Sequence, residues 1–217
     1  MKSDWRDFVI SGLCITIIFV SALGLVFLIQ PISARAFGHY GILFDAGMVA
    51  VSYGLLSAAL FRILLAFKPM PEGEHSMDTP AFVYWKLLTV LYRMGQGSLA
   101  WCTPFFLKPV LDILFGARIG GKVAFGGTID DPYMVTVGEG AILGNASLVS
   151  GNYLSGGTLV CGRVVIGAWA TVGANSVVLP GSSLGEGATL MSGSYLMPGT
   201  AVPAGEVWRG NPARKWK

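Results

Sequence analysis

The C-terminal half of the chain has a hydrophobic pattern with a period of six residues. An aliphatic residue recurs at every sixth position over nine consecutive hits, and a small or β-branched residue follows four places after most of them. The nine positions are Leu154, Val160, Ile166, Val172, Val178, Leu184, Leu190, Leu196 and Val202. A helix repeats every 3.6 residues and a plain strand every two. The pattern is therefore an internal repeat of another kind.

Each six-residue unit predicts a short strand followed by a tight turn. The aliphatic side chain would point into a narrow interior, which it shares with the small residue at the fifth place. The glycines that follow the aliphatic residue, Gly167, Gly173 and Gly185, predict corners with a positive φ. Three units would close one triangular coil of a parallel β-helix, and each coil is buried only by stacking on its neighbours.

The repeat continues upstream in a shifted frame, with good units at Val137 and Leu143 and a first unit at Ile119. Between Val149 and Leu154 the step is five residues, so the register breaks at 149–153. In a repeat protein such a break marks a loop on one face, often the functional one. A tolerated deletion would leave the same pattern.

The first 70 residues form a membrane-type segment. Residues 8–29 contain no charge, and a second apolar run, 46–67, is interrupted only by Arg62. Each run is long enough to cross about 30 Å of hydrocarbon, so the sequence predicts two transmembrane helices. A signal peptide fits less well because a second run follows. The distribution of Lys and Arg predicts that both termini are cytoplasmic and that 31–44 lies outside.

A polar linker, 69–80, leads to residues 81–115, which are apolar but interrupted by charges. We expect interfacial amphipathic helices there that lay the β-helix against the bilayer. Burial against the β-helix or another subunit would give the same pattern. The expected domains are a two-span anchor at 1–68, a linker with interfacial helices at 69–118, and a β-helix at 119–217.

Composition adds little to this picture. The hydrophobic fraction of 53% and the 30 glycines follow from apolar helices joined to a Gly-rich repeat, and the net charge is only +3. Basic residues do not cluster with aromatic ones, so we expect no nucleic-acid partner. Cys14, Cys102 and Cys161 have neither disulfide nor metal spacing. We interpret Cys14 and Cys161 as packing residues.

Three stretches resemble a known superfamily. Residues 202–214, Val-Pro-Ala-Gly-Glu-Val-Trp-Arg-Gly-Asn-Pro-Ala-Arg, are similar to the closing motif of hexapeptide-repeat acyltransferases, and 177–181 to their late turn. Residues 114–120 and 130–138 resemble membrane-attached β-helix domains related to the C-terminal domains of poly-lysine-type peptide synthetases. The resemblance covers about residues 80–217. It implies a left-handed β-helix and a homotrimer, and we place the chain in a bacterial inner membrane.

The resemblance also implies acyl transfer from a thioester, commonly acetyl-CoA, to a hydroxyl or amine. Acyl-CoA would be a substrate rather than a tightly bound cofactor. Residues expected on the CoA side are Trp169, Trp208, Arg209, Asn211 and Arg214. Two structural roles compete with this expectation, because Trp169 would also cap the outer face and the closing motif would also cover the last coil.

The superfamily's catalytic histidine is missing at its expected place. That place is near Asn152, inside the register break. An asparagine side chain is not a general base, but it can orient an acceptor or donate to an oxyanion, so Asn152 and His75 are the candidate catalytic residues. His75, in the linker, reaches the site only if the linker folds over the β-helix, and His39 is expected across the membrane. Early carboxylates fit solvated turns better than a base; these are Asp130, Asp131 and Glu139.

Two functions follow from these observations. The first is a membrane-anchored acyltransferase that acts on a lipid-linked or envelope-polymer acceptor. The second is a non-catalytic trimeric scaffold, an accessory subunit of a larger membrane complex. A zinc enzyme is disfavoured because the coils contain no histidine to bind the metal.

Overall fold

The computed structural model describes residues 5–216, without the side chains of Arg6, Asp7 and Phe105. The chain forms two compact units that alternate along the sequence. Unit 1 comprises Met1–Met70 and Pro80–Leu107, and unit 2 comprises Pro71–Thr79 and Lys108–Lys217. The linker between the second and third helices therefore belongs to unit 2.

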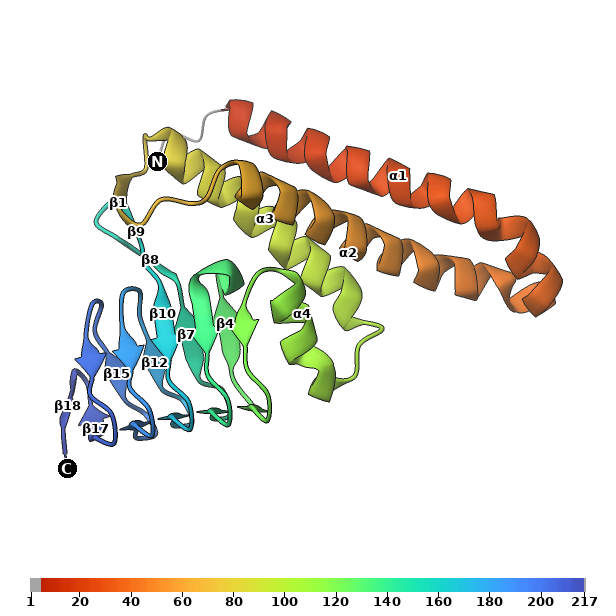
Figure 1. The fold of residues 1–217 in the computed structure, drawn as a ribbon. Helices are drawn as coiled ribbons and strands as arrows, with labels where there is room; N and C mark the ends of the chain where they lie inside the picture. The colour runs from red at the N-terminus through yellow and green to blue at the C-terminus, as the bar shows by residue number, and fades with distance from the viewer. Residues whose placement is uncertain (1–4, 217) are drawn as a thin grey trace. The chain divides into compact units, whose positions relative to one another are not determined.

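Unit 1 is helical. It contains α1 (Trp5–Phe37), η1 (Gly38–Tyr40), α2 (Gly41–Phe67), α3 (Pro80–Ala100) and η2 (Phe105–Leu107). The short 3-10 turn η1 joins α1 and α2 into an antiparallel hairpin (Figure 1). Pro31 lies inside α1, so the helix continues beyond the uncharged run 8–29. The Ser33 hydroxyl donates to the Gln30 carbonyl, 3.0 Å away, beside the proline.

One candidate membrane span is found among the described residues, the segment Phe8–Phe67, which contains α1 from Phe8 onward and all of α2. Most exposed side chains of α1 are apolar. A helix that is apolar all round is typical of a membrane segment or of the centre of a large protein. The division of this segment into two transmembrane helices stays a prediction.

Helix α3 packs antiparallel along the second half of α2. The Ser57 hydroxyl donates to the Leu91 carbonyl over 2.7 Å, and the Ser98 hydroxyl donates to the Ala50 carbonyl over 2.6 Å. Gly54 lies against Leu99 so closely that a Cβ would be 2.3 Å from its side chain. The apolar side of α3 therefore meets α2, where small residues allow the two backbones to approach.

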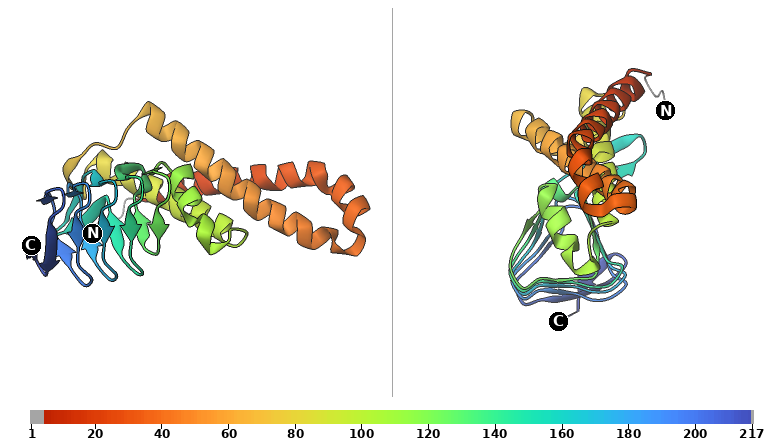
Figure 2. Two further views of the ribbon diagram at one scale, coloured as in Figure 1. Left: turned by 60° about the horizontal axis from the view of Figure 1, so that its bottom comes forward. Right: turned by 90° about the vertical axis from the view of Figure 1, so that its right-hand side faces the viewer.

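Unit 2 is a solenoid of short parallel strands in three sheets. The first sheet contains, in order, β16 (Ala201–Val202), β13 (Ser183–Leu184), β10 (Val164–Ile166), β5 (Val135–Val137) and β2 (Arg118–Ile119). The second contains β18 (Ala213–Lys215), β17 (Val207–Gly210), β14 (Thr189–Leu190), β11 (Thr171–Val172), β6 (Ile142–Leu143) and β3 (Ala124–Phe125). The third contains β15 (Tyr195–Leu196), β12 (Val177–Val178), β7 (Leu148–Ser150) and β4 (Thr128–Asp130). Figure 2 shows the triangular coils in the view along their stack.

The aliphatic repeat lines the interior of the solenoid, as the sequence predicted. From Val137 to Val202 its members on the coils are 2% exposed or less, and Ala170, Ala188 and Ser176 share the interior with them. The first position of the predicted run is an exception, because the Leu154 side chain is 48% exposed. Leu154 belongs to a strand outside the coils.

The glycine after the aliphatic residue has a different role from the predicted one. Gly167, Gly173 and Gly185 do not have a positive φ. Instead, a Cβ on Gly173 would lie 2.3 Å from the backbone nitrogen of Ser192 in the next coil. The left-handed residue comes two places later, as at Asn175 with φ 55°. The prediction was wrong because stacked backbones lie only about 4.8 Å apart and leave no room for a side chain.

Both ends of the solenoid are covered. At the N-terminal end lies α4 (Lys108–Leu114), and the Lys108 ammonium donates to the Gly127 carbonyl over 2.7 Å. At the C-terminal end the chain turns back, because β18 pairs antiparallel with β17. Terminal coils of a solenoid need such covers, since their neighbours protect only one side.

Candidate functional site

The register break is an inserted hairpin. Interior residues Val149 of β7 and Ile166 of β10 are 17 residues apart instead of six. The insertion forms β8 (Asn152–Ser155) and β9 (Thr158–Cys161), which pair antiparallel outside the coils. The five-residue step expected from the sequence was therefore wrong. Leu154 and Val160 fit the six-residue period by coincidence, because both lie in the hairpin.

A buried carboxylate holds Asn152 at the base of this hairpin. The Asn152 side-chain amide donates from Nδ2 to Oδ2 of Asp131 over 2.6 Å, and Asp131 is fully buried. Asp131 sits in the turn before η3 (Pro132–Met134), in the left-handed conformation with φ 52°. The Ser150 hydroxyl donates to the Asn152 carbonyl over 2.7 Å. Asn152 is thus held from two sides.

The hydrogen bond fixes which way the Asn152 amide points. A carboxylate only accepts hydrogen bonds, so the NH2 group faces Asp131 and the side-chain oxygen faces away. Asn152 is half-buried, and its side-chain oxygen takes no part in the bond to Asp131. It would accept a hydrogen bond from a hydroxyl or an amine.

Cys161 lies directly opposite Asn152 in the hairpin. Burial, and secondarily the negative charge of Asp131, raise the pKa of its thiol to about 12. The thiolate is the nucleophilic form of cysteine. Cys161 is therefore protonated at neutral pH and packs as an apolar side chain, although it lies in the hairpin rather than in a coil.

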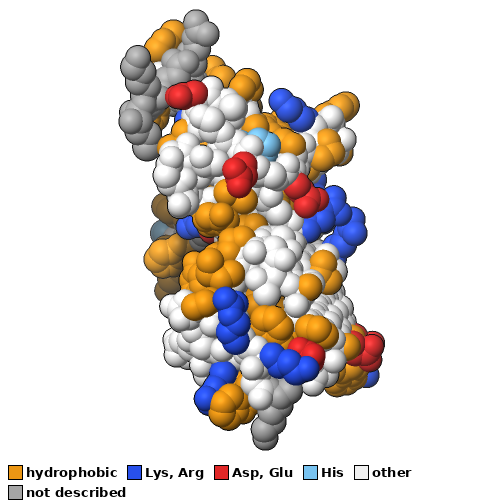
Figure 3. Space-filling model, turned by 90° about the vertical axis from the view of Figure 1, so that its left-hand side faces the viewer, with side chains coloured by type: hydrophobic (Ala, Val, Ile, Leu, Met, Phe, Trp, Pro, Cys, Tyr) orange, Lys and Arg blue, Asp and Glu red, His pale blue; other side chains and the backbone are white. Residues whose placement is uncertain are grey.

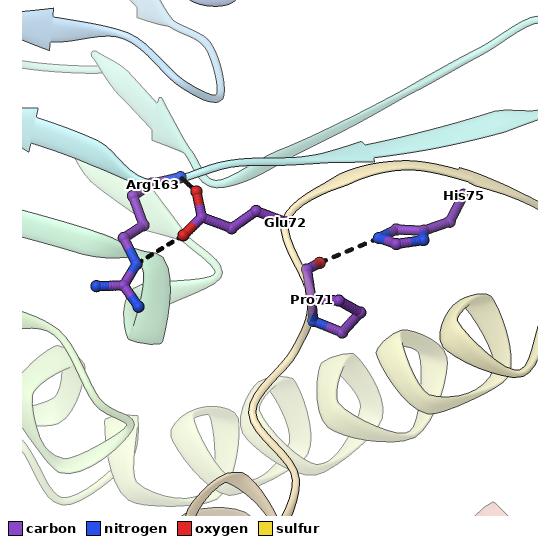
Figure 4. Close-up of polar contacts among 4 residues, drawn as sticks. All are labelled: Pro71, Glu72, His75 and Arg163. Carbon is purple, nitrogen blue, oxygen red and sulfur yellow. Dashed lines mark hydrogen bonds and ion pairs between the residues drawn. The ribbon is translucent and has the colours of Figure 1, made fainter.

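The linker adds a third strand to the hairpin. Strand β1 (Gly73–Ser76) pairs antiparallel with β9, which gives the order β1-β9-β8. The Arg163 Nε lies 2.8 Å from Glu72 Oε1 (Figure 4). The backbone N–H of Met77 donates to the Gly157 carbonyl. The 69–80 segment, expected as a polar linker, is thus partly a strand.

His75 and Asn152 are carried by the same small sheet but do not meet. His75 pairs with Leu159, which pairs with Leu154, so all three side chains share a face with Asn152 and Cys161. Two strand spacings and two residues separate His75 from Asn152, a distance of about 12 Å. The His75 imidazole lies 3.0 Å from the Pro71 carbonyl instead (Figure 4). The catalytic roles assigned to both residues stay predictions.

Burial of Leu159, rather than the ion pair, is expected to hold β1 in place. Leu159 is fully buried, and truncating such a side chain costs about 2–5 kcal/mol. The Glu72–Arg163 pair is exposed, and such pairs contribute about 0–1 kcal/mol. Leu159→Ala should therefore speed amide hydrogen exchange in 73–76 and 158–161, and Glu72→Ala should leave it nearly unchanged. If Glu72→Ala sped the exchange more than Leu159→Ala, the ion pair would be the main contact that holds β1.

Trp169 occupies a strained corner of the solenoid. Its φ is 57°, a conformation that is rare for a bulky residue, and its side chain is 57% exposed. The indole lies over Gly140 of the preceding coil, where a Cβ would be 2.4 Å from the ring. Gly140 therefore makes room for an aromatic surface on the outside of the corner.

The predicted closing motif forms the β17–β18 hairpin. Trp208 packs against the core and donates from its indole to Glu206 over 2.8 Å. Hydrogen bonds from Lys215 and Trp208 hold the pKa of Glu206 below its usual value. Arg209 and Arg214 face each other across the hairpin, and Asn211 begins its turn with a cis bond to Pro212.

The two arginines give this end of the solenoid a positive surface. The Arg209 guanidinium stacks 3.1 Å from the centre of the Trp216 ring, and Lys215 pairs with Glu206. Lys and Arg side chains are mixed with hydrophobic ones over this end in Figure 3. Trp169 lies two coils away, about 10 Å along the stack. One coil thus lies between Trp169 and the other residues expected on the CoA side. Their role in CoA binding stays a prediction.

Asp131 is buried and bonds to Asn152, so the prediction that it lies in a solvated turn is wrong. The signal was its place before a proline in the irregular stretch 125–136, where Asp tolerates the left-handed conformation. Glu139, by contrast, is an exposed residue paired with Lys122 over 3.2 Å. Residues 5–216 hold no group of three potential metal ligands.

No protein-family model and no curated protein sequence matches the chain. Solved structures do match it. A hexapeptide-repeat acetyltransferase from Vibrio cholerae O1 biovar eltor, in complex with acetyl coenzyme A, is 17% identical, covers 70% of this chain and 96% of its own, and has a TM-score of 0.52. A maltose O-acetyltransferase from Clostridium difficile 630 is 19% identical, covers 67% and 92%, and has a TM-score of 0.45.

A hexapeptide transferase family protein from Anaplasma phagocytophilum is 25% identical, with a TM-score of 0.32. The match covers 46% of this chain and 54% of that one, so the chain spans about half of that protein's length. The β-solenoid of unit 2 shares its fold with the hexapeptide-repeat acetyltransferase from Vibrio cholerae. This confirms the fold predicted from the six-residue repeat.

Proposed function

We propose that this chain is a membrane-attached acyltransferase that uses acetyl-CoA or another acyl thioester. The observation that supports it best is the inserted hairpin, which brings a half-buried Asn152 onto a buried Asp131. The acetyl-CoA complex of the structurally similar Vibrio cholerae protein supports the same class of donor. The acceptor would be a hydroxyl or amine of a lipid-linked or envelope-polymer precursor.

The proposed reaction is a direct transfer. The acceptor oxygen or nitrogen bonds to the thioester carbonyl carbon, the carbon–sulfur bond breaks, and the acceptor proton ends on the CoA thiol. The side-chain oxygen of Asn152 would accept a hydrogen bond from the acceptor and orient its lone pair. His75 would need to move about 12 Å to take the proton as a base.

The donor would bind along the outside of the solenoid. Trp169 offers an exposed ring to the pantetheine arm. Arg209 and Arg214 would pair with phosphates, which suits guanidinium groups, and Trp208 and Asn211 would shape the same end. A homotrimer would place such a site between neighbouring solenoids. CoA would bind as a substrate and leave with each turnover.

Membrane attachment is proposed through the segment Phe8–Phe67. In the topology predicted from the sequence, both termini are cytoplasmic, where acyl-CoA is available, and residues 31–44 are outside. A lipid-linked acceptor would then meet the solenoid at the inner leaflet.

A second function, a non-catalytic scaffold, is favoured by one specific observation. The position expected to hold the base holds Asn152, and its amide is already committed to Asp131. Such a protein would be an accessory subunit of a larger membrane complex. It would copurify stably with that complex and would not consume acyl-CoA.

Incubation of the purified full-length protein with radiolabelled acetyl-CoA and a membrane lipid extract tests the proposal. Acyl transfer to an extractable acceptor is expected. Arg209→Ala combined with Arg214→Ala should raise KM for acetyl-CoA, whereas Lys122→Ala, an exposed cation on an early coil, should not. Absence of both CoA binding and acyl transfer would contradict the acyltransferase proposal and favour the scaffold function.

A further inference from the structure

The connections of α3 limit how unit 1 can lie in a membrane. Thr79, which ends a segment of unit 2, directly precedes α3, and Lys108 of unit 2 follows it after a short turn. The helix has 21 residues and is therefore about 31 Å long. Both ends of α3 are thus joined to unit 2, the unit that contains the solenoid.

The chain after α3 is too short to bring it back across a bilayer. Only residues 101–107 separate the end of α3 from Lys108, and even fully extended they reach about 25 Å. They are far from extended, because Cys102 and Thr103 continue the last helical turn by bonding to Leu99 and Ala100. Residues 105–107 are a 3-10 helix. If α3 crossed the bilayer, its two ends would lie on opposite faces, and residues 101–107 are too short to bring the chain back to unit 2.

Helix α2 must share the direction of α3. Hydrogen bonds join the two helices near both ends of α3, from the Tyr84 hydroxyl to the Lys68 carbonyl and from the Ser98 hydroxyl to the Ala50 carbonyl. If α3 does not cross the bilayer, the α2 segment from Ala50 to Phe67 does not cross it either. The rest of α2, Gly41–Val49, is about 13 Å long and cannot span about 30 Å of hydrocarbon.

The charges and aromatic residues of this part agree with a position at the surface of the bilayer. Arg62, Lys86 and Arg93 lie along the paired segments, and ionisable groups are costly at the centre of a bilayer. Trp101 and Phe106, in the turn after α3, are 91% and 75% exposed. Aromatic side chains favour the interface between hydrocarbon and headgroups.

We propose that unit 1 is a monotopic anchor that lies in one leaflet of a phospholipid bilayer. In this arrangement α3 and the second half of α2 run parallel to the membrane plane, and the α1–α2 tip does not reach the opposite face. The inference rests on the proposed membrane attachment and replaces its two-span form. The proposed lipid-linked acceptor would lie in the same leaflet.

Depth measurements along one exposed stripe of α2 test the orientation. Leu55, Ala59, Ile63 and Phe67 are exposed and spaced four residues apart, so they lie on one face. Each is changed to cysteine in a full-length Cys14→Ala, Cys102→Ser background, where the buried Cys161 is unreactive. Nitroxide labels in phosphatidylcholine–phosphatidylglycerol bilayers then report accessibility to oxygen and to a water-soluble nickel chelate.

The monotopic anchor predicts nearly equal depth at all four labels. A transverse helix predicts instead a steady change over about 18 Å between positions 55 and 67, and that result would overturn the inference. Two reference labels test membrane attachment separately from the orientation of α2. They are Leu25→Cys on α1 and Ser155→Cys at the exposed end of the hairpin. Water exposure of every label, Leu25→Cys included, would refute membrane attachment itself.

Discussion

Gly173→Ala is expected to destabilise the solenoid by about 3 kcal/mol or more, the upper end for overpacking a tight interior. The added Cβ would lie 2.3 Å from the Ser192 nitrogen and 2.6 Å from the Met191 carbonyl carbon, both backbone atoms. Backbone cannot rotate away as a side chain can, so neighbouring coils would have to separate. For a chain of this size the melting temperature should fall by roughly 6–12 °C.

Gly121→Ala is the matched control. No atom lies within 4 Å of the position of its Cβ, and its φ is not positive. Thermal unfolding of both full-length variants in detergent, followed by far-ultraviolet circular dichroism, compares them directly. If Gly173→Ala and Gly121→Ala have the same melting temperature, the coils are less closely stacked than the structure shows.

Asn152→His is expected to raise the acyl-transfer rate about 10²–10⁴-fold, the usual contribution of a positioned general base. An imidazole at this position would donate one N–H to Asp131, which now accepts from the Asn152 amide over 2.6 Å. Its second nitrogen would then be free to take the acceptor proton. The rate of CoA release with acetyl-CoA and the lipid extract measures the effect.

Asn152→Ala distinguishes the base from a general opening of the site. It removes the hydrogen bond to Asp131 without supplying a proton acceptor, so the rate should not rise. Equal rates for Asn152→His and the unchanged protein would mean that the proton leaves by another route. A gain confined to Asn152→His would show a complete acyl-CoA site that lacks only its base.

The six-residue repeat predicted the solenoid because its period belongs to the coil itself. Every interior position from Val164 to Val202 follows from the pattern. The hairpin escaped prediction because Leu154 and Val160 happen to continue the period, and a period cannot tell an interior strand from a projecting one. The corner glycines were misassigned because contacts between coils, at Gly173 for example, are not visible in one unit of a repeat.

The candidate site was predictable only in part. The absence of a histidine at the expected position drew attention to Asn152 and to the segment that forms the β8–β9 hairpin. Its partner Asp131 is 21 residues away, on the preceding coil, and only the stacking of coils brings the two together. The pairing of β1 with β9 was likewise invisible, because the polar sequence of 69–80 shows no strand pattern.

The third strand of the site hairpin comes from a part of the chain made long before the other two. Residues 73–76 leave the ribosome about 80 positions ahead of β9, with α3, α4 and the six coil strands β2 to β7 in between. The hairpin is therefore completed late, by a contact of long range in sequence. A soluble fragment that starts at Lys108 would keep its coils, but β9 would become an open edge and Leu159 would lose its cover. Removal of the N-terminal helices with their linker thus alters the candidate site itself.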